Sequence, residues 1–327
     1  VFMNQFAEDY EGFWAGIAVH NNDPMDIGEY DGSLGFTGYP GAFVDRGTVT
    51  DPSSMQGQFE TRLQTAPTAV IDLGANWNMH TRIMNLTVSA DFQAAANSDY
   101  KVAVIVTEDD VTGTGSAWNQ SNAYSGGNNG AMGGYENLPN PVPAAQMVYN
   151  HVARGIAPAV GGFNGSFPAT VAAGETHKVN FELNFSPFIS IDNCHIVAIL
   201  IAPDGSIDNA GYATFAEAVA GDFDSDGTDA GTSMVGLDEN VDAVGPNFTV
   251  YPNPATSQAN IRVDLKTAGE VVVEVMDLSG KVMDARNYGS IQGTWDLPYE
   301  TKNLNAGVYL VKVSVDGVSS TRRLVIQ

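Results

Sequence analysis

The sequence predicts a multidomain, mainly β protein in which helices are confined to the N-terminal part. Apolar and polar residues alternate with a period of two in residues 84–90 and 179–185, the pattern of strands with one solvated face. Gly-containing turns separate short apolar segments near the C-terminus. The length of 327 residues suits about two or three domains.

The charge balance of the chain excludes some classes of partner. Only 14 Lys and Arg residues accompany 38 Asp and Glu residues, so the formal net charge is −24. Such a field repels phosphate backbones and anionic lipids, so we expect no nucleic-acid partner. The longest apolar run, residues 196–202, is much shorter than the roughly 20 residues that a bilayer requires, so we expect no membrane span.

Residues 1–66 are expected to mix helix and strand. The predicted elements are a helix through Tyr10, a buried strand over residues 14–20, a helix over residues 26–34, a Pro-Gly corner with a strand within residues 38–45, and a helix over residues 52–66. The chain opens inside an amphipathic helix that lacks a cap. We therefore expect further residues upstream of Val1.

Residues 67–220 are predicted to form a β-sandwich domain. The segments 101–107 and 195–202 are uniformly apolar and should be central strands. Between strands lies a long segment, Val111 to Tyr149, which is rich in Gly, Asn, Ser and Pro and carries Trp118, Tyr124 and Tyr135. Long loops within compact domains are uncommon and often functional. We consider a binding loop, with a solvated excursion pinned by its aromatic residues as the alternative.

An acidic linker is expected over residues 221–246. It contains an Asp-x-Asp-x-Asp-Gly pattern, and alternate carboxylates followed by a Gly turn can wrap one calcium ion. The candidate ligands are Asp222, Asp224, Asp226 and Asp229. An EF-hand would place a Glu at its twelfth position, where this chain has Ser233. A calcium loop and a solvated acidic linker therefore both stay open.

Residues 247–327 carry the most specific motifs. A Tyr-Pro-Asn-Pro segment opens the region, a Leu-Ser-Gly-Lys turn follows, and an Asn-Ala-Gly-Val-Tyr-Leu-Val-Lys block lies near the end. In this order the region resembles the type A sorting domain of proteins exported by the type IX secretion system of Bacteroidetes. The resemblance implies a small β-sandwich recognised by an outer-membrane translocon and shuttle barrel, and a generic immunoglobulin-like accessory domain is the alternative. The matching residues are Tyr251, Pro252, Asn253, Pro254, Gly307, Tyr309 and Lys312.

Residues 1–220 show a second resemblance. Segments 15–25 and 38–46 resemble the second part of a thioredoxin-like domain, and segments 104–111 and 149–154 resemble the outer membrane protein twenty-eight family, which pairs a thioredoxin-like unit with a β-rich domain. The thioredoxin-like resemblance implies a cis peptide bond before Pro40. Thioredoxin chemistry also requires a Cys-x-x-Cys pair, whereas the one cysteine here, Cys194, lies in the β-rich part. We expect it to be a buried small hydrophobe, with a reactive thiol as the alternative.

The ionisable residues show no established catalytic motif. The five histidines have no zinc-binding spacing, although His20 and His151 are candidates for local hydrogen-bond networks. The acidic run from Glu108 to Asp110 ends a predicted central strand, where it could bind a metal or a substrate or simply be solvated. A phosphate loop, a nucleophile elbow and a dinucleotide fingerprint are all absent from the sequence.

Together these observations predict a secreted protein of the cell surface or outer membrane, exported through the periplasm, with a binding or structural role and not a self-contained enzyme. The expected partners are the type IX translocon and shuttle barrel, and either a surface ligand or further copies of the chain. Calcium is the one cofactor considered. The alternative is a secreted thiol–disulfide oxidoreductase whose Cys-x-x-Cys lies upstream of residue 1, and a third hypothesis is export cargo bound to the secretion machinery.

Overall fold

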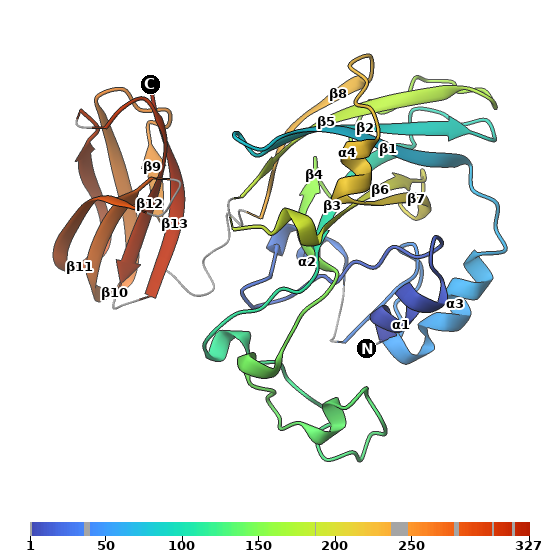
Figure 1. Ribbon diagram of the computed structural model, residues 1–327, viewed down its shortest axis with the longest axis horizontal. Helices are drawn as coiled ribbons and strands as arrows, with labels where there is room; N and C mark the ends of the chain where they lie inside the picture. The colour runs from blue at the N-terminus through green and yellow to red at the C-terminus, as the bar shows by residue number, and fades with distance from the viewer. Residues whose placement is uncertain are drawn as a thin grey trace. The chain divides into compact units, whose positions relative to one another are not determined.

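The computed structural model describes residues 2–35, 40–186, 188–236, 248–277, 281–302, 304–315 and 318–327. They form two compact units, residues 1–238 and residues 239–327 (Figure 1). The fold is mainly β with a small helical part, which confirms the predicted fold class.

Two four-stranded sheets form the framework of the first unit (Figure 1). The strand order is β1-β2-β5-β8 in one sheet and β4-β3-β6-β7 in the other. Neighbouring strands are antiparallel, except that β5 and β8 pair in parallel. The strands are β1 (Ala69–Asn78), β2 (Ile83–Phe92), β3 (Lys101–Glu108), β4 (Val152–Ala157), β5 (Thr176–Phe185), β6 (Cys194–Ile201), β7 (Ile207–Thr214) and β8 (Thr228–Val235).

One apolar core holds the two sheets face to face. Leu86 of β2 and Phe181 of β5 contribute from one sheet, and Val104 of β3 and Ile196 of β6 contribute from the other. All four side chains are almost completely buried. Each such burial stabilises the fold by about 1.5–3 kcal/mol, so the alternation seen in the sequence is converted directly into sheet packing.

The N-terminal residues form a third layer, which covers the other face of the β4-β3-β6-β7 sheet. Ile105 of β3 and Val197 of β6 belong to a second apolar cluster, in which they pack with Ile17, Ile27 and Tyr30. Because β3 and β6 are covered on both faces, their sequences are uniformly apolar. Their inner position in the sheet confirms that they are central strands.

The helices of the N-terminal layer lie where the sequence predicted them. They are α1 (Phe2–Asp9), α2 (Gly28–Ser33) and α3 (Met55–Arg62), with a 3-10 turn over Pro52–Ser54 before α3. The strand predicted over residues 14–20 is wrong, because this run forms only isolated bridges from Ala18 to Val152 and from His20 to Asp26. The run is apolar because it covers a sheet, not because it is a member of one.

The thioredoxin-like interpretation of this layer stays a prediction. Within residues 2–35 and 40–66 the described elements are helices and isolated bridges. The proposed cis bond joins Tyr39 to Pro40, and Tyr39 lies outside the described residues.

The interpretation of residues 221–246 as a linker does not hold for residues 228–235, which form β8. The preceding residues 221–227, here called the strap, run over the outer face of the β1-β2-β5-β8 sheet. The Asp224 backbone N–H donates to Thr87 Oγ1 (2.9 Å), and Asn180 Nδ2 donates to the Asp224 carbonyl (2.8 Å). Thr87 and Asn180 are opposite each other across β2 and β5, and both are buried. These polar side chains bind the strap backbone, which the composition of the acidic run does not reveal.

The second unit is one five-stranded antiparallel sheet wrapped over its own core. The long strands β10 (Gln258–Met276) and β11 (Val282–Glu300) pair with each other, while β9 (Phe248–Tyr251) and β12 (Gly307–Val315) pair with successive halves of β10. Strand β13 (Val318–Ile326) pairs with β12. Phe248, Ile261 and Leu324 are fully buried in a cluster that contains no residue of the first unit, so each unit has its own core.

Candidate functional site

The most unusual feature of the first unit is the chain between β3 and β4. Residues 111–149, here called the excursion, leave the sheet after Asp110 and return before Asn150 (Figure 1). Two hydrogen bonds of 2.9 Å close the base, one from the Val111 N–H to the Tyr149 carbonyl and one in the opposite direction. The Asp110 N–H also donates to Asn150 Oδ1 (3.0 Å). This base, residues 109–111 and 149–151, is here called the neck.

The excursion is held by contacts within itself and by apolar contacts of its base with the rest of the first unit. The Tyr149 hydroxyl donates to the Trp118 carbonyl (2.7 Å), and Asn122 Nδ2 donates to the Tyr135 carbonyl (2.7 Å). An apolar cluster joins Val111, Val142, Met147 and Tyr149 to Met25 of the N-terminal layer and Val152 of β4, and it is covered by Trp118, Tyr135 and Leu138. Of the three aromatic residues singled out by the sequence, Trp118 and Tyr135 therefore meet in one cluster, and Tyr124 is not part of it. The outer surface of the excursion is mainly polar and exposed.

A carboxylate and two imidazoles meet beside the neck. Asp109 follows β3, His151 precedes β4 and His195 lies in β6. Asp109 Oδ1 accepts the His151 backbone N–H (2.6 Å) and lies 3.7 Å from His151 Nδ1, while Asp109 Oδ2 lies 3.8 Å from His195 Nδ1. These three residues are here called the Asp109 cluster. They come together because β3 is antiparallel to β4 and β6, so the C-terminal end of β3 lies beside the N-terminal ends of β4 and β6.

Burial controls the electrostatics of this cluster. It lowers the pKa of both His151 and His195, and the negative charge of Asp109 opposes that effect. Burial also raises the pKa of Tyr212, whose ring is 5.2 Å from that of His195, to about 12, so its hydroxyl stays protonated at neutral pH. The cluster at neutral pH is therefore one carboxylate between uncharged rings. Among the described residues no three His, Cys, Asp or Glu side chains are arranged to hold a metal ion.

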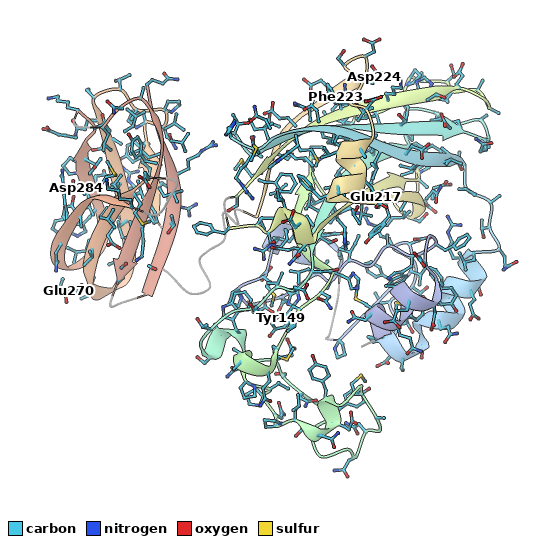
Figure 2. All side chains as sticks on the ribbon, in the orientation of Figure 1. Tyr149, Glu217, Phe223, Asp224, Glu270 and Asp284 are labelled. Atoms are coloured by element: carbon cyan, nitrogen blue, oxygen red, sulfur yellow. The ribbon has the colours of Figure 1, made fainter. Side chains whose placement is uncertain are left out.

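The acidic run spans the strap and the start of β8, and the carboxylates of Asp224 and Asp229 have separate partners. Asp224 pairs with Lys178 and also accepts the Asp226 N–H (2.9 Å) (Figure 2). Asp229 Oδ1 accepts the Gly231 N–H (2.8 Å). The backbone of Asp224 anchors the strap to the sheet, so the run has a structural role whether or not it binds an ion. Calcium binding by Asp222, Asp224, Asp226 and Asp229 stays a prediction.

In the second unit, Asn253 of the Tyr-Pro-Asn-Pro segment holds the last strand. Its Nδ2 donates to the Arg323 carbonyl and its Oδ1 accepts the Val325 N–H, both at 2.8 Å. The amide thus pairs with the edge of β13 as a strand backbone would. Ala255 continues the pairing through hydrogen bonds with Val325 (2.8 Å) and Gln327 (2.9 Å). The motif and the end of the chain are therefore adjacent.

Tyr251 joins an exposed polar group on the same unit. Its hydroxyl donates to Asp296 Oδ1 (2.6 Å), and Arg262 donates to both oxygens of the same carboxylate (2.8 and 2.9 Å). These hydrogen bonds, with that of Arg262 the strongest, lower the pKa of Asp296 to about 2. The arrangement keeps a charged, ordered patch beside Pro252 and Pro254, both of which are exposed.

The remaining motif residues lie in β12. Gly307 begins the strand, Lys312 Nζ binds Glu274 Oε2 of β10 (2.9 Å), and the Tyr309 hydroxyl donates to the Asn305 carbonyl (3.0 Å). These contacts lie within the unit. They show how the motif stabilises the domain but do not by themselves identify the surface that a partner contacts.

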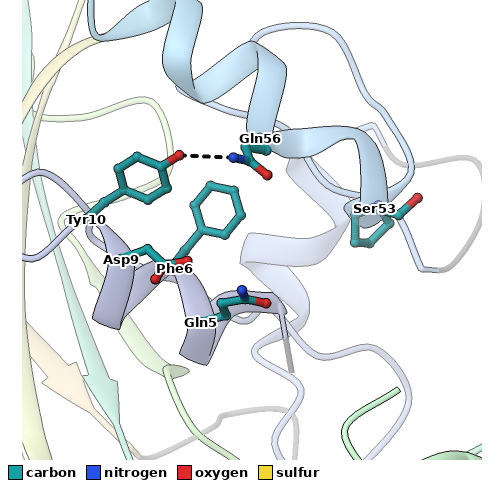
Figure 3. Close-up of a pocket in the computed structure, with 7 residues that line it drawn as sticks. Gln5, Phe6, Asp9, Tyr10, Ser53 and Gln56 are labelled. Carbon is teal, nitrogen blue, oxygen red and sulfur yellow. Dashed lines mark hydrogen bonds between the residues drawn. The ribbon is translucent and has the colours of Figure 1, made fainter. Parts of the chain in front are cut away.

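A shallow hollow lies where α1 and Tyr10 pack against the start of α3 and the 3-10 turn before it. Figure 3 shows Gln5, Phe6, Asp9 and Tyr10 of the first segment facing Ser53 and Gln56 of the second. Gln56 Nε2 donates to the Tyr10 hydroxyl (3.3 Å), which itself donates to Glu60 (2.9 Å). The hollow has no histidine or thiol in its lining, and we assign it no chemistry.

Cys194 is buried at the start of β6, as the sequence predicted. Burial and the nearby Glu108 carboxylate raise the pKa of its thiol to about 12, so the thiolate is scarce at neutral pH. We expect the native protein to react with Ellman's reagent at less than about one tenth of a thiol per chain, and the urea-unfolded protein to react stoichiometrically. Full reaction of the folded chain would contradict the assigned burial.

The sequence did not identify the Asp109 cluster as a unit. It marked Asp109 as a strand-end carboxylate and His151 as a network candidate, but included His195 only as one of the five histidines and as the first residue of the apolar segment 195–202. The available signal was that all three residues flank apolar strands. That signal does not show which strand ends lie side by side in the sheet.

Comparisons with known proteins identify relationships for both units. Residues 28–213 match the family described as outer membrane protein Omp28, and residues 249–327 match the family described as secretion system C-terminal sorting domain. A comparison with curated proteins returned no match. None of the helices in the described part of the chain has the length and hydropathy of a membrane span.

Among solved structures, the chain is similar to dimeric latent PorU from Porphyromonas gingivalis, with 12% identity over 80% of this chain and 20% of that one (TM-score 0.23). A red sea bream transglutaminase is 10% identical over 84% of this chain and 34% of that one, with a TM-score of 0.23. A Salmonella α2-macroglobulin is 9% identical over 80% of this chain and 17% of that one, with a TM-score of 0.22. The chain thus spans between 17% and 34% of the length of these proteins. At such TM-scores the likenesses carry no argument.

Proposed function

The chain belongs to the outer membrane protein Omp28 family, and from this premise we propose that it acts outside the cell as a binding or structural protein through its excursion. Its C-terminal type IX sorting domain marks it for export to the cell surface or outer membrane. The export signal and the outward function then belong to different units, since each unit has a separate core.

The observation that supports this proposal is the construction of the excursion. A segment of this length is displayed outside the sheets, closed at the neck by paired backbone hydrogen bonds and filled by Trp118, Tyr135 and Tyr149. Ordering so many residues costs conformational entropy, which a passive connection between two adjacent strands would not require. A prepared, mainly polar surface is suited to recognition because little further ordering is needed on binding.

The test replaces residues 113–147 with a short Gly-Ser linker and leaves the neck in place. The probe is intact cells of a type IX-secreting bacterium that lack this gene, to which purified protein is added. We expect saturable binding of the unaltered protein, and at least about a tenfold loss for the replaced chain. A matched control, Met79→Ser, removes an exposed apolar side chain (71% exposed) at the β1–β2 turn and should bind normally.

A structural role is distinguished in the same experiment by analytical ultracentrifugation of the purified protein. Loss of self-association in the replaced chain supports assembly, and loss of cell binding by a monomer supports a surface ligand. Unchanged binding and unchanged self-association in a folded replaced chain would refute the role of the excursion. The oxidoreductase alternative receives no support from the described residues, because their one thiol is buried.

We further propose that the type IX translocon and shuttle barrel contact the sorting domain near the Tyr-Pro-Asn-Pro segment. The support is that Pro252 and Pro254 are exposed, and that Asn253 joins them to the end of the chain. Handling by the type IX machinery follows from the sorting domain itself. In pull-downs with the purified shuttle barrel, Asn253→Ala should reduce capture, whereas Lys178→Ala in the first unit should not.

A further inference from the structure

The neck of the excursion is held in a constrained backbone conformation. Asp110 and His151, which occupy opposite sides of the neck, both have a φ of 57°. Residues other than glycine are uncommon in this left-handed region, and they persist there when surrounding contacts hold them. The contacts here are the hydrogen bonds from the Asp110 N–H to Asn150 and from the His151 N–H to Asp109. The Asp109 carboxylate is therefore one of the groups that keeps the neck closed.

Two imidazoles face that same carboxylate without a hydrogen bond to it. The separations of 3.7 Å to His151 and 3.8 Å to His195 exceed hydrogen-bond length. His195 Nδ1 is buried and has no hydrogen-bond partner in the described part of the chain, and the same is true of Thr107 Oγ1, directly across from it on β3. A proton on either ring would place a cation beside the carboxylate that binds the His151 N–H.

The groups around the two rings come from several elements. Asp109 and Glu217 are the negative charges that act on His195. Glu217 lies in α4 (Phe215–Ala220) (Figure 2). His151 is influenced by the charge of Asp109, and Tyr212 of β7 is uncharged. Gly16 of the N-terminal layer lies against the His151 ring, 3.3 Å from Cγ for a Cβ placed there, and adds no charge. The two rings also repel each other once both are charged.

We propose that Asp109, His151 and His195 form a proton-operated hinge, which holds the neck closed at neutral pH and loosens it on mild acidification. The excursion would then be displayed in a closed form at neutral pH and in a more mobile form in acidic surroundings. This inference rests on the geometry of the neck together with the burial of the two rings. It holds even if the excursion binds nothing.

The direction of the effect follows from the protonation of the rings. Burial lowers the pKa of both histidines in the folded protein, so the open form, in which the rings reach water, takes up protons more readily. The closed form is fully favoured above the unperturbed histidine pKa of about 6.5. The stability of the closed form relative to the open form is lost as the pH falls below about 6.5 and through the lower pKa values that the two histidines have in the folded protein.

The test is hydrogen–deuterium exchange of the full chain at pH about 7.5 and about 5.0, corrected for the intrinsic pH dependence of exchange. We expect the neck peptides, which contain the Val111 and Tyr149 amides, to lose about fivefold or more of their protection at the lower pH. Peptides from β2 should keep theirs. Equal protection of the neck at both values would overturn the proposal.

Variants separate titration from general weakening. His151→Asn with His195→Gln should abolish the pH difference, and asparagine tolerates the left-handed conformation at position 151. Asp109→Asn should move the loosening to higher pH, because the carboxylate stabilises the charged rings in the closed form and its loss makes protonation favour the open form more strongly. His177→Gln, which changes a histidine of β5 outside the cluster, should leave the transition in place. A neck that loosens with acid in the double variant, or an unmoved midpoint in Asp109→Asn, would contradict the hinge.

Discussion

A chain that ends at residue 238 is expected to fold as stably as the first unit does in the whole protein, yet to remain in the periplasm. Stability is retained because the cores of the two units share no residue. Export is lost because the sorting domain, residues 249–327, is removed. Calorimetry of the purified chain and immunodetection in cell fractions measure the two outcomes independently.

The matched control is a chain that ends at residue 220. It lacks the strap and β8, so it loses the buried Val235 side chain, the Asp224 contacts and the pairing along β5. We expect a loss of about 3 kcal/mol or more in the free energy of unfolding, from one buried apolar side chain and several hydrogen bonds. Equal stability of the two truncated chains would show that β8 is dispensable, and surface display of the chain ending at 238 would contradict the role of the sorting domain.

Gly74→Ala is expected to destabilise the first unit by about 1–3 kcal/mol, although only a methyl group is added. A Cβ at Gly74 would lie 2.3 Å from the carbonyl oxygen of Asp222, which is backbone of the strap and cannot rotate away. The strap must therefore move, and its hydrogen bonds with Thr87 and Asn180 weaken. Chemical unfolding in urea, monitored by circular dichroism, measures the change.

The control is the same substitution at a glycine without neighbours. Gly57 lies in α3, and a Cβ there would meet no atom within 4 Å outside its chain neighbours and the backbone of its own helix. Alanine is the better helix former, so Gly57→Ala should stabilise the protein by about 0.5–1 kcal/mol. If both substitutions had the same sign, close contact of the strap with β1 could not be the cause at Gly74.

Local patterns were sufficient for much of the fold. The alternation in β2 and β5 predicted strands with one buried face, and the uniformly apolar β3 and β6 proved to be inner strands covered on both sides. The same apolar signal misled over residues 14–20, which cover a sheet without joining it. Apolar composition reports that a segment is buried, but the hydrogen-bonding partner of its backbone depends on residues far away in the sequence.

The sorting domain and the family relationship could be recognised from motifs, because their residues are close together in the sequence and need no knowledge of contacts. The Asp109 cluster and the strap could not. His195 faces Asp109 only because β6 pairs with β3, and the acidic run of Asp224 becomes part of the framework only because Thr87 and Asn180 are neighbours across two strands. Periodicity and composition describe the surroundings of each segment alone, whereas strand order and register, which bring distant residues into contact, are set by the packing of the whole unit.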